Sequence, residues 1–294
     1  MNIHLVDGTY ELFRAYFAMP KITSPDGRPV GAVRGIMQTL LLLLRQEGTS
    51  HVACAFDHEV ESFRNAMFDG YKTGEGISED LLAQFDLAER AAKALGIVVW
   101  PMIEFEADDV IASAAHKWAE TQGVDQIVMC TPDKDLAQMV LDPKIVALDR
   151  RRDITLDTQG VVDKFGVMPE SIPDYLALVG DSADGIPGIP RWGAKSASIV
   201  LARYLHLEQI PSDVQQWDVT VRGAATMSAN LEERRSHAAL YKELATLRLD
   251  VPISETVEEL EWLGVPRAPF EALCAELGFN SMLTLPHRWL GEDA

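Results

Sequence analysis

Hydrophobic residues in the first half of the chain alternate between short continuous runs and segments with helical spacing. The short runs are rich in Val and Ile and have the length of strands: Ile3–Asp7, His51–Asp57, Ile97–Pro101 and Gln126–Asp133. The segments with helical spacing lie between them: Ala32–Gln46, Ser78–Leu95 and Ala107–Thr121. This alternation predicts an α/β fold with a mostly parallel sheet and helices on both faces.

The pattern changes after about Pro169, where strand signals fade and helical spacing dominates. We therefore expect an α/β domain over residues 1–168 and a helical region over 169–294. Within the second, Leu231–Leu249 predicts one amphipathic helix. Before the boundary, Ile145–Asp149 and Asp153–Leu156 predict a hairpin.

Two polar segments interrupt this α/β pattern, at residues 18–30 and at about 59–80. Long insertions that follow a sheet strand commonly carry function, because the rigid sheet positions them.

Charge and cysteine content narrow the classes of protein. Lys and Arg number 26 against 45 Asp and Glu, which gives a net charge of −19. This balance excludes a generic basic coat protein for nucleic acid and a polybasic membrane-surface protein, but it permits DNA contacts through local cations or bound metal ions. The three cysteines have neither zinc spacing nor a disulfide framework. We expect a cytoplasmic protein with no signal peptide and no membrane partner.

Acidic residues recur where the predicted strands end. Asp7 and Asp57 close the first two strands, and Asp133 and Asp135 follow the strand that begins at Gln126. In an open parallel sheet, ligands bind beyond the carboxyl ends of the strands. Three strands therefore direct acids toward one edge of the sheet.

Two further groups complete a set of nine acids in five places. Glu106, Asp108 and Asp109 open a predicted helix, and Asp181 with Asp184 begins the helical half. Each acid alone also has a structural explanation, because acids favour the first turn of a helix and Asp is common in turns after strands.

Convergence of these acids would require neutralisation. Two carboxylates about 6 Å apart at an effective dielectric constant of about 20 repel by about 3 kcal/mol. Several such pairs would exceed the net stability of an ordinary domain, so the carboxyls must take up protons or bind divalent cations. Oxygen ligands suit Mg²⁺ or Mn²⁺. Nine acids exceed the need of one ion, whereas two ions about 4 Å apart can clamp the attacking and leaving oxygens of a phosphodiester.

One rival chemistry uses similar residues. The segment Val6-Asp7-Gly8-Thr9 resembles the strand-end motif of haloacid-dehalogenase-type phosphatases. That family needs a nucleophilic Asp two residues before the aspartate of the Asp-Gly-Thr motif, where this chain has Leu5. No phosphoaspartate could form there, which disfavours this alternative.

Several motifs together resemble the 5′-nuclease family, which comprises flap endonucleases and the 5′→3′ exonuclease domain of bacterial DNA polymerase I. They occur in the family's order and cover nearly the whole chain: VDGTYELFRAYFA, SPDGRPVGAVRG, AFD…FR…YK, EADD, TPDKDLAQMV, ALVGDSADGIPGIP and RWGAKSA. The resemblance implies a PIN-like nuclease domain over 1–168 with a helical arch at about 59–80. It also implies a helical DNA-binding region over 169–294 with a helix–hairpin–helix motif at about 180–200.

The resemblance further implies a stand-alone, Mg²⁺-dependent nuclease of DNA replication or repair that cuts at 5′ flaps, nicks or ends. Two Mg²⁺ ions, replaceable by Mn²⁺, would be held by all nine acids. Asp7, Asp57, Glu106 and Asp108 would lie mainly around one ion, and Asp109, Asp133, Asp135, Asp181 and Asp184 mainly around the other.

The same resemblance assigns roles beyond the metal ligands. Lys72 and Arg64 would add positive charge at the scissile phosphate, and Tyr71 would stack on the terminal base. Around the hairpin, phosphates of duplex DNA would be gripped by Gly188, Arg191, Gly193 and Lys195. A K⁺ ion held by backbone carbonyls is also expected at this hairpin.

Four positions depart from the family pattern. Pro132 and Arg191 each stand where the family usually has Gly, Gly185 replaces Asn, and Glu75 replaces a basic residue. The changes spare the metal ligands and affect parts that handle DNA, so we expect retained catalysis with altered substrate preference. The alternatives are a branched-DNA-binding homologue that cleaves weakly and a PIN-type ribonuclease.

Overall fold

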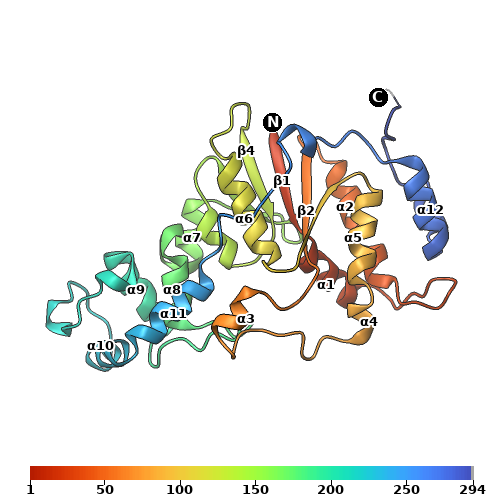
Figure 1. Cartoon of the computed structure of the whole chain (residues 1–294). Helices are drawn as coiled ribbons and strands as arrows, with labels where there is room; N and C mark the ends of the chain where they lie inside the picture. The colour runs from red at the N-terminus through yellow and green to blue at the C-terminus, as the bar shows by residue number, and fades with distance from the viewer. Residues whose placement is uncertain (293–294) are drawn as a thin grey trace. The chain divides into compact units, whose positions relative to one another are not determined.

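The computed structural model describes residues 1–292, which form two compact units (Figure 1). The first unit comprises Met1–Val60, Gly74–Thr131 and the segment from Leu249 onward. The second comprises Glu61–Thr73 and Pro132–Arg248. Each unit therefore contains segments that are distant in sequence.

Parallel strands form the centre of the first unit. They are β1 (Asn2–Asp7), β2 (His51–Asp57), β3 (Val98–Met102) and β4 (Gln126–Cys130), in the order β3-β2-β1-β4. The chain moves outward from β1 to β3 and then returns to the other side of β1 for β4. Right-handed crossovers consequently place the connecting helices on opposite faces, which confirms the predicted fold class.

The helices of the first unit cover this sheet from both sides. They are α1 (Gly8–Ala18), α2 (Gly31–Leu44), α4 (Glu79–Leu82), α5 (Phe85–Ala94), α6 (Ala107–Trp118) and α12 (Arg267–Leu277). Helix α6 packs along the strands on one side, and α2 and α5 lie on the other (Figure 1). Helix α12 packs on α5, so the C-terminal segment completes this layer.

The predicted helix Ser78–Leu95 is wrong as a single element, because the chain leaves the helix between α4 and α5. Gln84 lies at this break with 1% exposure. Its Oε1 accepts hydrogen bonds from the N–H groups of Ala32 and Val33 at 2.9 and 3.3 Å, and its Nε2 donates to the carbonyl of Asp80. The buried amide oxygen accepts two N–H groups of the first turn of α2, which have no partners within that helix. The break between α4 and α5 lies at the residue that makes this contact.

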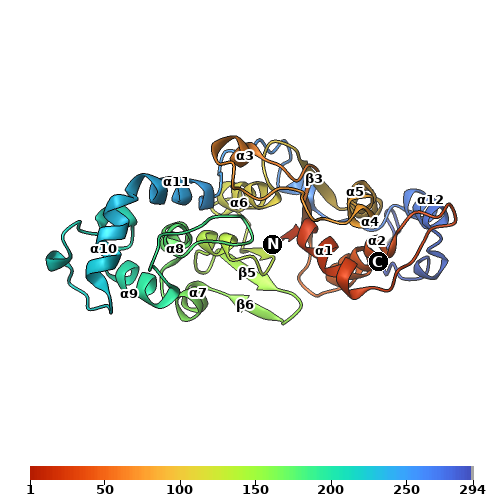
Figure 2. The same cartoon turned by 90° about the horizontal axis from the view of Figure 1, so that it is seen from below.

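The second unit contains an antiparallel hairpin and a set of helices. The strands are β5 (Ile145–Asp149) and β6 (Ile154–Leu156), as the sequence predicts. The helices are α3 (Phe63–Met67), α7 (Thr158–Phe165), α8 (Ile172–Val179), α9 (Ala194–Tyr204), α10 (Ala224–Glu233) and α11 (Arg235–Ala245). Figure 2 shows the hairpin beside α7, while α8 packs against both α9 and α11.

The expected single helix Leu231–Leu249 is also wrong, because it divides at Arg234. The backbone there has φ −119° and ψ 23°, outside the helical range. Next to the break, the guanidinium of Arg235 donates to the carbonyl of Ile210 at 2.9 Å. Helix α11 then ends at Ala245, and its C-cap residue Thr246 has an extended backbone.

None of the described helices is long and apolar enough to cross a membrane.

Candidate metal centre

Three carboxylates of the second unit meet in one place. Asp135, Asp181 and Asp184 each place a carboxylate oxygen within 4.8 Å of the others, and among residues 1–292 they form the sole acid group with this spacing. Their relative exposures are 8%, 5% and 9%, respectively. We refer to these residues as the acid triad. It is compact enough to share one cation.

Short-range hydrogen bonds fix the loop that carries two of these acids. Asp181 exchanges two backbone hydrogen bonds with Ile186, at 2.7 and 2.8 Å. The Asp181 carboxylate also accepts the N–H of Ala183 at 3.0 Å. The loop therefore holds Asp181 and Asp184 in a closed turn immediately after α8.

Glycine at position 185 is required by this turn. Gly185 has φ +75°, and a Cβ there would lie 2.0 Å from the carbonyl oxygen of Gly70. Beside this contact, the N–H of Lys72 donates to the carbonyl of Asp184 at 3.0 Å. The close approach explains why this chain has Gly where the family pattern has Asn, since any side chain would separate the two segments.

Two lysines lie against the acid triad. Lys134 Nζ is 2.5 Å from Asp181 Oδ2 and 3.8 Å from Asp135 Oδ1, and Lys72 Nζ is 3.2 Å from Asp184 Oδ1. Burial lowers the pKa of Lys134, but Asp135 and Asp181 outweigh this effect, so the pKa lies above its ordinary value. The two lysines neutralise part of the negative charge of the acid triad. A bound cation would neutralise the remainder.

Within the acid triad, Asp135 lies farthest from its lysine partner. Burial, together with the charges of Asp133 and Asp184, raises the pKa of Asp135 well above its ordinary range. Its Oδ1 is buried and accepts no hydrogen bond from the described residues. A desolvated carboxylate oxygen that faces two further carboxylates has the chemistry of a ligand for a hard divalent cation. The residues present therefore fit such an ion.

Asp133 lies beside the acid triad but outside it. Its Oδ1 accepts the backbone N–H of Asp135 at 2.9 Å. This hydrogen bond closes the turn that directs Asp135 inward.

The acids of the first unit are positioned by backbone donors instead. Asp7 accepts the N–H of Tyr10 at 2.8 Å and the hydroxyl of Thr131 at 2.9 Å. Asp57 accepts the N–H of Ala107 at 2.8 Å, which joins the end of β2 to the start of α6. Both acids stand at the carboxyl ends of their strands, where the sequence places them.

The start of α6 carries the remaining three acids. Asp109, which is 0% exposed, accepts the backbone N–H of Glu106 at 3.0 Å in a capping box. Asp108 is half-buried in the same turn. The contact of Asp57 with Ala107 brings this turn next to the end of β2.

The three residues expected to meet the substrate differ in accessibility. The Lys72 side chain is 30% exposed. Arg64 is 1% exposed, and its guanidinium donates to the carbonyls of Leu244 and Thr246 at 2.8 and 3.2 Å. Tyr71 is 4% exposed. Of these three side chains, Lys72 is therefore the accessible one in this structure.

The hairpin residues also divide into buried and exposed positions. Gly188 is buried with φ +71°, and a Cβ there would lie 2.5 Å from the nitrogen of Gly180. Arg191, Gly193 and Lys195 are exposed around the first turn of α9, and a Cβ at Gly193 would meet nothing within 4 Å. The exposed positions leave the N-terminus of α9 accessible to an anion.

Sequence reasoning missed the roles of Lys134 and Gln138. The position of Lys134 between two acids of the TPDKDL motif was a usable indication of its charge pairing. The sequence around Gln138 gave no indication of its role, because two of its three amide hydrogen bonds are made with Ala245 and Leu247, more than a hundred residues away.

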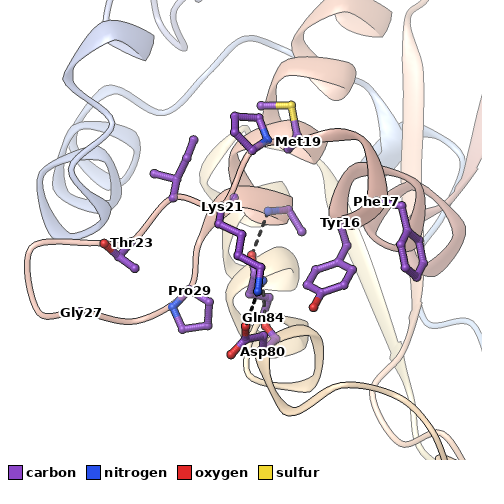
Figure 3. A pocket seen from close by; sticks show the side chains of 13 residues that line it. Tyr16, Phe17, Met19, Lys21, Thr23, Gly27, Pro29, Asp80 and Gln84 are labelled. Carbon is purple, nitrogen blue, oxygen red and sulfur yellow. Dashed lines mark hydrogen bonds and ion pairs between the residues drawn. The ribbon is translucent and has the colours of Figure 1, made fainter.

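The first unit also contains a pocket of about 390 Å³ (Figure 3). Its lining is mainly apolar, from the end of α1 and the following loop, with Lys21 and Asp80 paired at 3.7 Å. None of the nine candidate acids lines it. The pocket therefore shares none of its lining residues with the acids of the candidate metal centre.

Two family models match the chain. Residues 2–166 match the 5′-3′ exonuclease N-terminal resolvase-like domain, and residues 167–267 match the 5′-3′ exonuclease C-terminal SAM fold.

Individual relatives agree with these models. The chain is 37% identical to DNA polymerase I of Pseudomonas aeruginosa over 95% of its own length and 31% of the relative. It is 34% identical to a 5′-3′ exonuclease of Buchnera aphidicola subsp. Baizongia pistaciae, over 90% of this chain and 87% of that protein. The chain spans about a third of the DNA polymerase I relatives that it matches.

A solved structure shows the same fold at low identity. The bacteriophage T5 flap endonuclease, in a complex with DNA and metal ions, superimposes with a TM-score of 0.66 and 18% identity, over 83% of this chain and 89% of that one.

Proposed function

This chain belongs to the 5′-3′ exonuclease family, and from that premise we propose that it hydrolyses DNA phosphodiesters at 5′ flaps, nicks or ends with two divalent metal ions. The observation that carries the proposal is the acid triad, in which the buried Asp135 Oδ1 accepts no hydrogen bond from the described residues. We assign Mg²⁺ as the natural ion, with Mn²⁺ as a substitute, and a K⁺ ion to the carbonyls of the hairpin. We also propose a cytoplasmic role in replication or repair, and the name DNA polymerase I of several relatives supports the replication or repair part.

In this proposal the nine acids act as ligands or hold ligands in place. Asp135, Asp181 and Asp184 would bind directly from the second unit, and Asp133 would orient Asp135. In the first unit the ligands would be Asp7, Asp57, Glu106, Asp108 and Asp109. When bound, two divalent ions supply hydroxide at neutral pH and stabilise the leaving oxygen.

The remaining residues would bind and orient the DNA. Lys72 is accessible beside Asp184 and would neutralise the scissile phosphate. Arg191, Gly193 and Lys195 would hold duplex phosphates without reading sequence. These assignments divide the chain into a nuclease part over 1–168 and a DNA-binding part over 169–294.

The test is cleavage of a 5′-labelled flap substrate in Mg²⁺ by the wild-type chain and by Asp181→Asn. We expect cleavage by the first and not the second, while both bind the flap in Ca²⁺. Asp163→Asn removes an exposed acid of the same unit and is the matched control. DNA binding without cleavage in Mg²⁺ or Mn²⁺ would instead identify a binding homologue. Preferential cleavage of RNA with the same geometry would identify a ribonuclease.

A further inference from the structure

We propose that Gln138 and Arg64 are positioning residues that fix an acid and a cation of the metal centre onto one short segment, residues 244–247, where α11 ends. This inference rests on the proposed function and extends it to residues that touch neither metal nor DNA. All the contacts that carry it lie within the second unit.

Gln138 joins the acid-bearing turn to this segment. Its Nε2 donates to the carbonyls of Asp135 and Ala245, at 2.8 and 3.0 Å. Its Oε1 accepts the N–H of Leu247 at 3.0 Å. One amide therefore satisfies three backbone groups and ties the main chain of Asp135 to the end of α11.

Arg64 makes the complementary contact from the cation-bearing segment. Its guanidinium donates to the carbonyls of Leu244 and Thr246 and is almost fully buried. Carbonyls at a helix C-terminus lack partners within the helix and attract a cation, so this contact is favourable. Next to Arg64, Asn65 Nδ2 donates to the carbonyl of Lys72 at 2.8 Å. The place of Lys72 thus depends on α3, which Arg64 holds.

The two side chains use alternate backbone groups of the segment. Arg64 takes the carbonyls of residues 244 and 246, and Gln138 takes the carbonyl of 245 and the N–H of 247. Together they therefore satisfy main-chain groups of the last turn of α11 and of the two residues that follow it.

Helix α11 is also anchored to the helix that precedes the other two acids. Lys242 Nζ lies 2.8 Å from Asp174, a fully buried carboxylate of α8, and α8 leads directly to Asp181. Contacts with α11 thus help to position Asp135, Lys72 and the loop that carries Asp181.

The test measures Mn²⁺ binding to the full chain by calorimetry, without DNA, and then flap cleavage at saturating Mn²⁺. Gln138→Met removes three hydrogen bonds at similar volume. We expect it to weaken Mn²⁺ binding by roughly tenfold, since partners that orient metal ligands have effects of this size. Gln138→Asn retains an amide that is too short to bridge, and it should weaken binding in the same direction.

Arg64→Met should leave Mn²⁺ affinity unchanged and lower kcat by roughly tenfold with little change in KM, because it displaces Lys72 rather than a ligand. Arg64→Lys, which keeps a cation at the helix end, should restore part of kcat. Tyr204→Phe is the matched control. It removes two hydrogen bonds of the same unit, to Gln216 and Asp218, away from the acid triad, and should change thermal stability alone.

Gln138 and Arg64 variants that lose thermal stability as Tyr204→Phe does, but keep wild-type Mn²⁺ affinity and kcat, would overturn the inference. A wild-type chain that binds Mn²⁺ without cleaving DNA would overturn the proposed function. In that case the Mn²⁺ affinity of Gln138→Met would still show whether Gln138 positions the metal centre. A wild-type chain that binds no Mn²⁺ would overturn both.

Discussion

The acids of the two units are held in opposite ways. In the first unit, Asp7, Asp57 and Asp109 each accept a hydrogen bond from a backbone N–H group. These hydrogen bonds replace those that water would make to the carboxylates. In the second unit, the acid triad is desolvated, and its members face one another and two lysines. The first set contributes to the stability of the metal-free chain, whereas the buried Asp135 of the second opposes it. Similar acidic motifs can therefore have opposite energetic roles.

The largest expected effect is on catalysis. Asp181→Ala should lower flap cleavage by more than about a hundredfold, because a lost metal ligand costs more than the 10–100-fold of an outer partner. The rate is measured at saturating DNA and Mg²⁺, with circular dichroism to show that the variant is folded. Near-normal cleavage by the folded variant would remove Asp181 from the metal centre.

The next effect is stabilisation by the ion. Mn²⁺ at about one hundred times its Kd should add about 2.7 kcal/mol to the free energy of unfolding. The gain is expected to depend on the acid triad, so Asp181→Asn should lose most of it and EDTA should reverse it in the wild-type chain. Denaturant titrations with and without Mn²⁺ measure it. An equal gain in the variant would place the ion elsewhere.

Substitutions without metal test the energetic contrast directly. Asp7→Ala removes the N-cap of α1 and should lower the free energy of unfolding by about 1 kcal/mol. Asp135→Asn relieves burial of a charge and repulsion from Asp133 and Asp184, so it should raise that free energy in EDTA. Urea titrations at pH 7.5 give both values. A shift in the same direction for both variants would contradict the contrast between the units.

The smallest effect concerns pH. Because the pKa of Asp135 is raised in the folded chain, the folded state holds this proton more tightly than the unfolded state does. This contribution to stability is lost as pH rises from the ordinary carboxyl range through the raised pKa. Urea titrations in EDTA between pH 4.5 and 8 should therefore show a more downward trend with pH in the wild-type chain than in Asp135→Asn. Parallel trends would indicate that Asp135 titrates normally.

Much of the fold could be predicted from hydrophobic spacing. The strands at β1, β2, β3 and β4 and the β5–β6 hairpin lie within a few residues of their expected positions. The family is confirmed as well, while the roles of individual site residues stay predictions. The failures are the breaks at Gln84 and Arg234, where the helical spacing of hydrophobic residues continues along the sequence but the helix itself is interrupted. At Gln84 the cause is a buried amide that serves another helix.

The sequence by itself determined the parallel sheet, the acids at the strand ends and the family, because side-chain periodicity, turn residues and motif order are properties of neighbouring residues. Only the tertiary structure decided which acids meet, why residue 185 has no side chain, and that Arg64 and Gln138 share the end of α11. Those partners lie up to 182 residues apart, and a hydrogen bond or a pKa depends on the distance and solvent access that folding creates.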